Sequence, residues 1–190
     1  RFAATLVQAR SGQLWLDSRT RRYIPAEGEL VVGYVLDRHA ENFLVDIGGP
    51  FNALLPTLAF EGATKRNRPN LRPGDVVYAR VAEASRDMEP TITCVDASGR
   101  ASGMGHLKEG TVVQVSTSGA RRMLQSPPPP HLMELGRLVA FEMAPGANGR
   151  VWVAATDVAK VVLLAQVLQK ADMLSDAQAA MLVKRMCAAA

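Results

Sequence analysis

The feature that most constrains the fold is a series of five short runs rich in Val, Ile, Tyr and Phe between residues 27 and 97. Turn residues separate the runs, and no amphipathic helical pattern lies between them. Phe43, Val45 and Ile47 occupy alternate positions, as in a strand with one buried face. The predicted strands are Leu30–Leu36, Asn42–Ile47, Phe51–Leu55, Asp75–Ala84 and Thr91–Asp96. Five such strands in about 70 residues predict a small closed barrel of the OB type.

Helical patterns join the strands after about residue 98. The predicted elements are, in order, a strand at 111–116, helices at 118–124 and 131–138, strands at 139–143 and 150–154, and helices from Thr156 and Ser175. Thr156 is a good N-cap, and Ser175 and Gln178 have capping-box spacing. The core side of the longer helix is predicted to carry Val158, Val161, Val162, Ala165 and Leu168. The order β-α-α-β-β-α plus an extra helix is the layout of a KH domain.

The segment of residues 1–26 predicts a β-hairpin. Strands at 5–9 and 13–17 flank Arg10-Ser11-Gly12, which places a glycine where a tight turn needs positive φ. With the barrel at 27–97 and the KH domain at 98–190, this hairpin gives an α+β chain of three parts. Gly103-Met104-Gly105 is interpreted as a flexible junction between the last two parts.

The charge of the chain is unevenly distributed. Lys and Arg outnumber Asp and Glu by 22 to 18, a mild surplus that is compatible with a polyanionic partner without requiring one. Between Gly62 and Gly74, however, there are four basic residues and no acid. A local surplus of this kind is what a surface needs in order to follow a phosphate backbone.

Several other classes of protein do not fit the sequence. Cys94 and Cys187 are the only cysteines, so both are predicted to be reduced thiols in a nuclear or cytosolic protein. No apolar run approaches the ~18 residues that a membrane span requires. His39, His106 and His131 lack zinc-ligand spacing and no nucleotide-binding glycine motif appears, so neither a metal nor a cofactor is predicted. Because residue 1 is not Met, we expect the chain to be part of a longer one.

Four segments carry a resemblance to a known family. They are 60–70 (FEGATKRNRPN), 87–90 (DMEP), 99–105 (GRASGMG) and 146–153 (GANGRVWV). With the order of β piece, barrel and KH domain, they resemble the S1–KH cap subunits of the RNA exosome. The resemblance implies a non-catalytic subunit that, with other S1–KH caps, sits on a ring of RNase PH-like subunits. It also implies that such a cap guides single-stranded RNA into a central channel for 3′–5′ processing, in the nucleus, nucleolus and cytoplasm.

The RNA-binding residues are predicted mainly on the loops of the barrel. The predicted set is Lys65, Arg66, Arg68, Arg38, His39, Arg86 and Tyr78. The first three lie in the long insert before the fourth strand, which the resemblance places near the channel entrance. Arg38 and His39 follow the first strand and Arg86 precedes the fifth, in loops that OB folds often use for oligonucleotides. Tyr78 shares a strand face with Arg80 and is a candidate stacking ring, although it suits a protein interface equally well.

The KH part departs from the usual KH pattern. A typical KH domain clamps nucleotides with a GXXG loop between its first two helices, where this chain has the prolines 127–130. Proline offers no backbone N–H to a phosphate, so the usual clamp is missing. Gly146, Asn148 and Gly149 instead resemble the GxNG element of the exosome caps, which implies a structural role in packing the KH domain against the barrel.

Three alternatives remain open at this stage. The chain could be purely a structural clamp between ring subunits, with its basic surfaces meeting acidic protein. Asp87 and Glu89 match the Asp-x-Glu opening of two-metal exonucleases, but no supporting acidic pattern stands out. A translation-related S1 protein is the third alternative, which the KH part and the GANG turn make less favourable.

Overall fold

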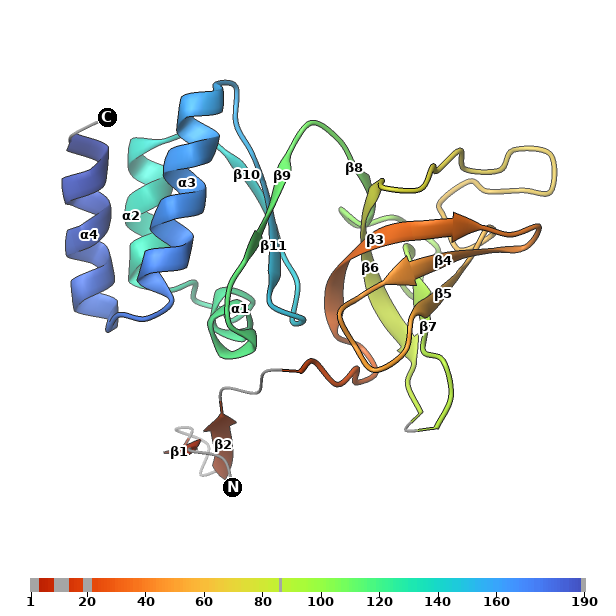
Figure 1. Ribbon diagram of the computed structural model, residues 1–190, viewed down its shortest axis with the longest axis horizontal. Coiled ribbons are helices and arrows are strands. Elements are labelled where there is room, and N and C mark those ends of the chain that lie inside the picture. The colour runs from red at the N-terminus through yellow and green to blue at the C-terminus, as the bar shows by residue number, and fades with distance from the viewer. Residues whose placement is uncertain (1–3, 9–13, 19–21, 86, 189–190) are drawn as a thin grey trace.

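A small N-terminal β-sheet begins the computed structural model, which describes residues 4–8, 14–18, 22–85 and 87–188. Strands β1 (Ala4–Gln8) and β2 (Leu14–Ser18) pair in antiparallel fashion, with Leu6 opposite Leu16. The predicted turn at 10–12 lies outside the described residues. This sheet stands apart from the rest of the chain in Figure 1.

A closed barrel forms the centre of the chain, as the five short apolar runs predicted. Its strands are β3 (Leu30–Arg38), β4 (Asn42–Asp46), β5 (Ala53–Pro56), β6 (Val76–Glu83) and β7 (Thr91–Thr93). The order is β3-β4-β5-β7-β6, and pairing between β3 and β6 closes the sheet on itself. Phe43, Val45 and Ile47 are fully buried, so the alternating pattern of this strand marks its core face.

The segment that follows the barrel is not a free linker. Strand β8 (Gly105–Leu107) pairs with β6, with Tyr78 opposite Gly105 and Val76 opposite Leu107. Met104 is buried in the same core as the barrel strands. The interpretation of residues 103–105 as a flexible junction is therefore wrong, because a β-ladder and a buried side chain fix this segment.

A KH layout of helices and strands completes the chain. Its elements are β9 (Thr111–Gln114), α1 (Thr117–Met123), α2 (Pro130–Leu138), β10 (Glu142–Pro145), β11 (Arg150–Ala154), α3 (Val158–Ala171) and α4 (Asp176–Ala188). The sheet has the antiparallel order β10-β11-β9. In Figure 1 this sheet lies between the helices and the barrel. The two faces of this sheet therefore line two separate hydrophobic cores. Val151 and Val153 pack with the helices, whereas Ala144 and Trp152 pack with the barrel.

Two boundaries and one helix face differ from the sequence prediction. The strand expected at 139–143 begins at Glu142, and Asp157 rather than Thr156 caps α3, accepting a hydrogen bond from the Ala159 N–H at 3.0 Å. The buried face of α3 carries Leu164, Val167, Leu168 and Ala171, whereas Val158 and Val162 are exposed. The sequence analysis placed the buried face of α3 wrongly because almost every side of this helix is apolar. No helix among the described residues combines the length and apolarity needed to cross a membrane.

Candidate nucleic-acid interface

A basic cluster forms where the long insert of the barrel meets the turn between β3 and β4. The guanidinium of Arg38 donates from Nη1 to Asn70 Oδ1 at 3.1 Å. In the opposite direction, Arg68 donates from Nη1 to the backbone carbonyl of Ala40 at 2.7 Å. These two bonds join segments about 30 residues apart in sequence, so the structure brings the two predicted groups of basic residues together.

The tip of the insert is a tight turn that presents its cations to solvent. The Thr64 N–H donates to the Asn67 carbonyl and the Asn67 N–H donates to Thr64 Oγ1, both at 3.0 Å. Lys65 and Arg66 lie inside this turn and are exposed. Within the described residues, neither side chain makes a hydrogen bond or an ion pair. Their charges are therefore available to an anion from outside the chain.

The other residues of the predicted RNA-binding set differ in what the structure shows of them. Arg38 and Arg68 are exposed, and each donates a hydrogen bond that joins the two loops. His39 is exposed beside Arg38, and its backbone N–H closes the turn by donating to the Asn42 carbonyl at 2.8 Å. Arg86 lies outside the described residues. The cluster that the structure describes thus consists of Lys65, Arg66, Arg68, Arg38 and His39, which we call the basic loop cluster.

Tyr78 is placed differently from the prediction of an exposed stacking ring. Its side chain is buried against the KH part, and its hydroxyl donates to the Pro145 carbonyl at 2.9 Å. Burial raises the pKa of the Tyr78 phenol to about 12. We correct the stacking interpretation for this reason: a ring enclosed by two packed domains offers no face to a base.

The GANG turn between β10 and β11 enters the barrel wall. The Asn148 amide Nδ2 donates to the carbonyls of Val32 at 2.7 Å and Ile47 at 2.8 Å, while its Oδ1 accepts from the Val32 N–H at 3.3 Å. The Ala147 N–H adds a bond to the Leu30 carbonyl at 2.7 Å. One buried side chain therefore satisfies three backbone groups of the barrel, two on β3 and one at Ile47, directly after β4.

Two glycines of this turn have steric reasons to be glycine. A Cβ atom on Gly146 would lie 2.6 Å from the Val32 nitrogen, so the close approach of the turn to β3 excludes a side chain. Gly149 has a φ of +80°, and a Cβ there would lie 2.7 Å from the Val115 carbonyl oxygen. Gly146, Asn148 and Gly149 therefore act as one element at the contact between barrel and KH sheet.

Arg150 extends this contact, and the sequence analysis did not single it out. Its Nη2 pairs with Asp46 Oδ2 at 2.7 Å, and its guanidinium lies 5.0 Å from the centroid of the Tyr34 ring. Partial burial tends to raise the pKa of Asp46, but the hydrogen bond from Arg150, the hydrogen bond from the Gly48 N–H and the charge of Arg150 together lower this pKa. The available signal was that Arg150 immediately follows the GANG turn in a strand whose neighbours are apolar.

The alternative metal site was proposed around Asp87 and Glu89. Asp87 and Glu89 are both exposed in the loop before β7. Within the described residues, no three His, Cys, Asp or Glu side chains are grouped so that they could hold a metal ion. The basic loop cluster carries exposed cations that can make ionic and hydrogen-bonding contacts with an anionic group.

Comparisons with known proteins agree with this architecture. A model of the S1 domain of exosome complex component RRP40 matches residues 23–105, and a KH domain model matches residues 110–159. The chain is 42% identical to exosome complex component rrp40 of Schizosaccharomyces pombe over 92% of its own length and 73% of that protein. It is 41% identical to RRP40 of Mus musculus over 88% of its own length.

The match to the mammalian relatives is partial in length. The chain spans 61% of the mouse protein and 64% of the human protein, to which it is 38% identical over 92% of its own length. A crystal structure described as that of an exosome complex RNA-binding protein superimposes with a TM-score of 0.70 over 87% of this chain and 97% of the other. At 19% identity, this last likeness shows the fold alone.

Proposed function

The chain belongs to the RRP40 family of exosome complex components, and from this membership we propose that it is a non-catalytic cap subunit that guides single-stranded RNA into the exosome for 3′–5′ processing and degradation. The observation that carries the proposal is the basic loop cluster, in which Lys65 and Arg66 are exposed and unpaired within the described residues. An anionic polymer passing this end of the barrel meets cations whose charge no carboxylate of the described chain neutralises.

The chemistry of the basic loop cluster fits RNA contact without sequence choice. Lys and Arg side chains contact phosphates, which gives affinity but does not read bases. Each phosphate that is neutralised releases counterions, so the affinity falls steeply as salt rises. A guiding subunit needs this behaviour, because it must accept many transcripts and let each one slide.

The KH part supplies the second half of the proposal, which is attachment. We propose that it docks the barrel onto RNase PH-like ring subunits, beside other S1–KH caps, in the nucleus, nucleolus and cytoplasm. The names of the relatives support a place in an exosome complex. We also propose that the chain is divided into an N-terminal β region at residues 1–26, the barrel at 27–97 and the KH domain at 98–190.

The experiment is a charge reversal at the tip of the insert. The double substitution Lys65→Glu and Arg66→Glu spares Arg68, whose hydrogen bonds hold the cluster together. In the full chain at about 100 mM salt, we expect affinity for a single-stranded oligouridylate to fall at least about tenfold. The slope of log affinity against log salt should decrease in magnitude by about two, one for each lost contact.

The matched control reverses the same charge elsewhere. Lys160 and Lys170 are exposed on α3. The double substitution Lys160→Glu and Lys170→Glu changes the net charge by the same amount. If this control weakens RNA binding as much as the loop variant, only the net charge matters and the assignment of the loop is wrong. If neither variant weakens binding, the proposed RNA contact fails altogether.

A structural clamp with little RNA contact is the second candidate function. Apolar side chains exposed on α3 and on the segments around it favour a protein partner, with Val158 78%, Met173 71% and Met181 68% exposed. If the clamp is the main role, the loop double variant should bind oligouridylate like the parent chain. A substitution of Val158 by Glu should instead release the chain from the assembled complex on a sizing column.

A further inference from the structure

The loop that follows β7 is closed by one carboxylate. Asp96 Oδ1 accepts from the Ser98 N–H at 2.8 Å, from the Ser98 hydroxyl at 2.6 Å and from the Arg100 N–H at 3.0 Å. Its Oδ2 accepts from the Ser102 hydroxyl at 2.6 Å, and the Asp96 N–H donates to the Arg100 carbonyl at 2.8 Å. We call residues 96–102 the Asp96 loop. These bonds give the loop a fixed shape although it contains no helix or strand.

The end of the Asp96 loop has an unfavourable backbone conformation that the carboxylate holds in place. Ser102 has a φ of +46° without being glycine, which costs energy. Such a conformation persists where neighbouring contacts fix it, as the hydrogen bond from Ser102 to Asp96 does here. The Ser102 hydroxyl, together with the other donors to this carboxylate, lowers the pKa of Asp96. The carboxylate is therefore charged and the loop closed at neutral pH.

The Asp96 loop is tied to the insert that carries the basic loop cluster. Glu61 Oε2 accepts from the Ala101 N–H at 2.8 Å. A second bond joins the same two segments, since the Cys94 N–H donates to the Ala59 carbonyl at 2.9 Å. Lys65 follows Glu61 by four positions, and a chain spans at most ~3.6 Å per residue, so the two Cα atoms lie within about 15 Å of each other. The Asp96 loop is therefore a neighbour of the basic loop cluster.

Arg100 is the cation that the Asp96 loop presents to solvent. Its side chain is exposed, and within the described residues its guanidinium makes no hydrogen bond or ion pair. The carboxylates of Asp96 and Glu61 bond to the backbone of the loop instead. Because these bonds already order the backbone, a contact through Arg100 loses less conformational entropy on binding. The loop thus holds an unneutralised positive charge ready for an external anion.

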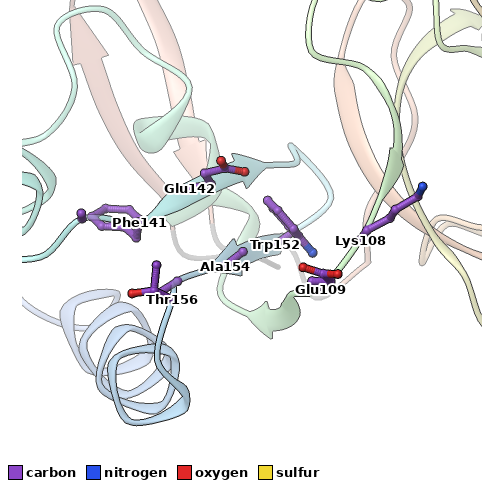
Figure 2. Close-up of a pocket in the computed structure, with 9 residues that line it drawn as sticks. Lys108, Glu109, Phe141, Glu142, Trp152, Ala154 and Thr156 are labelled. Atoms are coloured by element: carbon purple, nitrogen blue, oxygen red, sulfur yellow. The ribbon is translucent and has the colours of Figure 1, made fainter.

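The next cation along the chain marks the limit of this positive surface. Lys108 lines a cavity on the KH sheet, where Figure 2 also shows Glu109 and Glu142. The two carboxylates outweigh the single charge of Lys108 for an approaching phosphate, whereas the guanidinium of Arg100 has no such neighbour bonded to it. Lys108 therefore provides a matched control for Arg100.

We propose that Arg100 is a further phosphate contact for single-stranded RNA, presented by the Asp96 loop beside the basic loop cluster, and that Glu61 positions this loop. The inference rests on the proposed RNA-guiding function and adds a second loop to the RNA-binding surface. The planar guanidinium of Arg100 can donate two parallel hydrogen bonds to one phosphate, a contact that reads no base. A strand that passes Lys65 and Arg66 therefore meets a third cation.

The first test replaces the guanidinium of Arg100 by a neutral amide. In the full chain at about 100 mM salt, Arg100→Gln should weaken the binding of a single-stranded oligouridylate about fivefold. The slope of log affinity against log salt should decrease in magnitude by about one. Lys108→Gln removes the same charge and should change the affinity by less than about twofold. Parent-like binding by Arg100→Gln, or an equal loss with Lys108→Gln, would overturn the inference.

The second test separates the position of the Asp96 loop from its charge. Glu61→Ala removes an acid beside the cations, so charge alone predicts tighter RNA binding. Loss of the bond to Ala101 predicts the opposite, about threefold weaker binding, because Arg100 is no longer held. Glu61→Gln keeps an acceptor for the Ala101 N–H and should bind at least as tightly as the parent. Tighter binding by Glu61→Ala, or an equal loss in the Arg100→Gln background, would show that Glu61 does not position Arg100.

The outcomes separate this inference from the proposed function. If the Lys65→Glu and Arg66→Glu double variant binds oligouridylate weakly and Arg100→Gln binds it like the parent, the inference fails alone. If neither variant weakens binding, both fail. A poly-glutamate peptide of equal charge serves as the competitor. If it displaces oligouridylate and loses affinity for Arg100→Gln to the same degree, Arg100 belongs to a contact with acidic protein, and its assignment to RNA is wrong.

Discussion

Two short segments of similar composition have opposite environments in this molecule. The GANG turn with Arg150 (residues 146–150) and the tip of the barrel insert (residues 64–70) are both built from Asn, Arg and small or turn-forming residues. The first is buried, and its Asn148 bonds to barrel groups more than 100 positions away in sequence. The second is exposed, and among the described residues Asn67 bonds only to Thr64 and Gly62 of the same loop.

The difference shows that composition does not decide whether such a loop holds a structure together or meets a ligand. At the GANG turn both polar atoms of the Asn148 side chain have protein partners, so this side chain serves the contact between the two domains. At the insert, Lys65 and Arg66 have no described partner, so their charges can act on an external anion. Satisfied polar groups fix the two domains relative to each other, and unsatisfied ones are left for binding.

The largest expected effect comes from removing the buried amide. Asn148→Ala leaves the Val32 and Ile47 backbone groups without partners inside the contact, which should cost about 2–4 kcal/mol of unfolding free energy. The matched variant Asn67→Ala removes an exposed amide with local bonds and should change stability by less than about 0.5 kcal/mol. Urea denaturation of both variants measures the contrast. Equal losses would show that the two loops do not differ as described.

The sequence predicted the layout of the fold because the fold follows from local patterns. Five apolar runs without a helix led to the barrel, and the switch to helical periodicity led to the KH layout. The misplaced features depend on tertiary contacts instead. Strand β8 was missed because Gly103 and Gly105 indicate a loop locally, whereas pairing with β6 and burial of Met104 decide their structure. The buried side of α3 was misjudged because its other faces are also apolar.

The charge of the candidate site could be predicted from the sequence, whereas the contacts of its side chains could not. A run of cations without acids identifies the insert from sequence alone. No local pattern shows that Arg38 reaches Asn70, or that the ring of Tyr78 is enclosed by the KH part. The pair of Arg150 and Asp46 is invisible for the same reason, since it joins strands of two different domains.

A second contrast compares the arginines of the two segments. Arg150→Met keeps the aliphatic bulk but leaves Asp46 and its carbonyl without their donor, which should cost about 1–3 kcal/mol. Arg68→Met removes exposed bonds to Ala40 and Lys65, and should cost less than about 1 kcal/mol while loosening the basic loop cluster. Combining Arg150→Met with Asp46→Asn tests the pair directly. If the losses of the two single variants simply add, then Arg150 and Asp46 do not interact in solution.

The smallest expected effect is the response of the domain contact to acid. Because Arg150 and the Gly48 N–H lower the pKa of Asp46 in the folded state, the unfolded state binds this proton more readily. The stabilisation is therefore complete above the ordinary carboxyl pKa of about 3.9 and is lost as the pH falls through the lower folded value. The effect is modest because the Asp46 side chain is 35% exposed and water screens the pair.

Its measurement compares the parent chain with Asp46→Asn. The difference in unfolding free energy between the two should be constant from neutral pH to about pH 5 and should shrink below about pH 4. The insert contains no carboxylate between residues 62 and 74, so it offers no such acid-sensitive ion pair. Parallel curves for the parent and the variant down to acid pH would mean that Asp46 is not paired with Arg150, and that the domain contact rests on Asn148 and the packing around it.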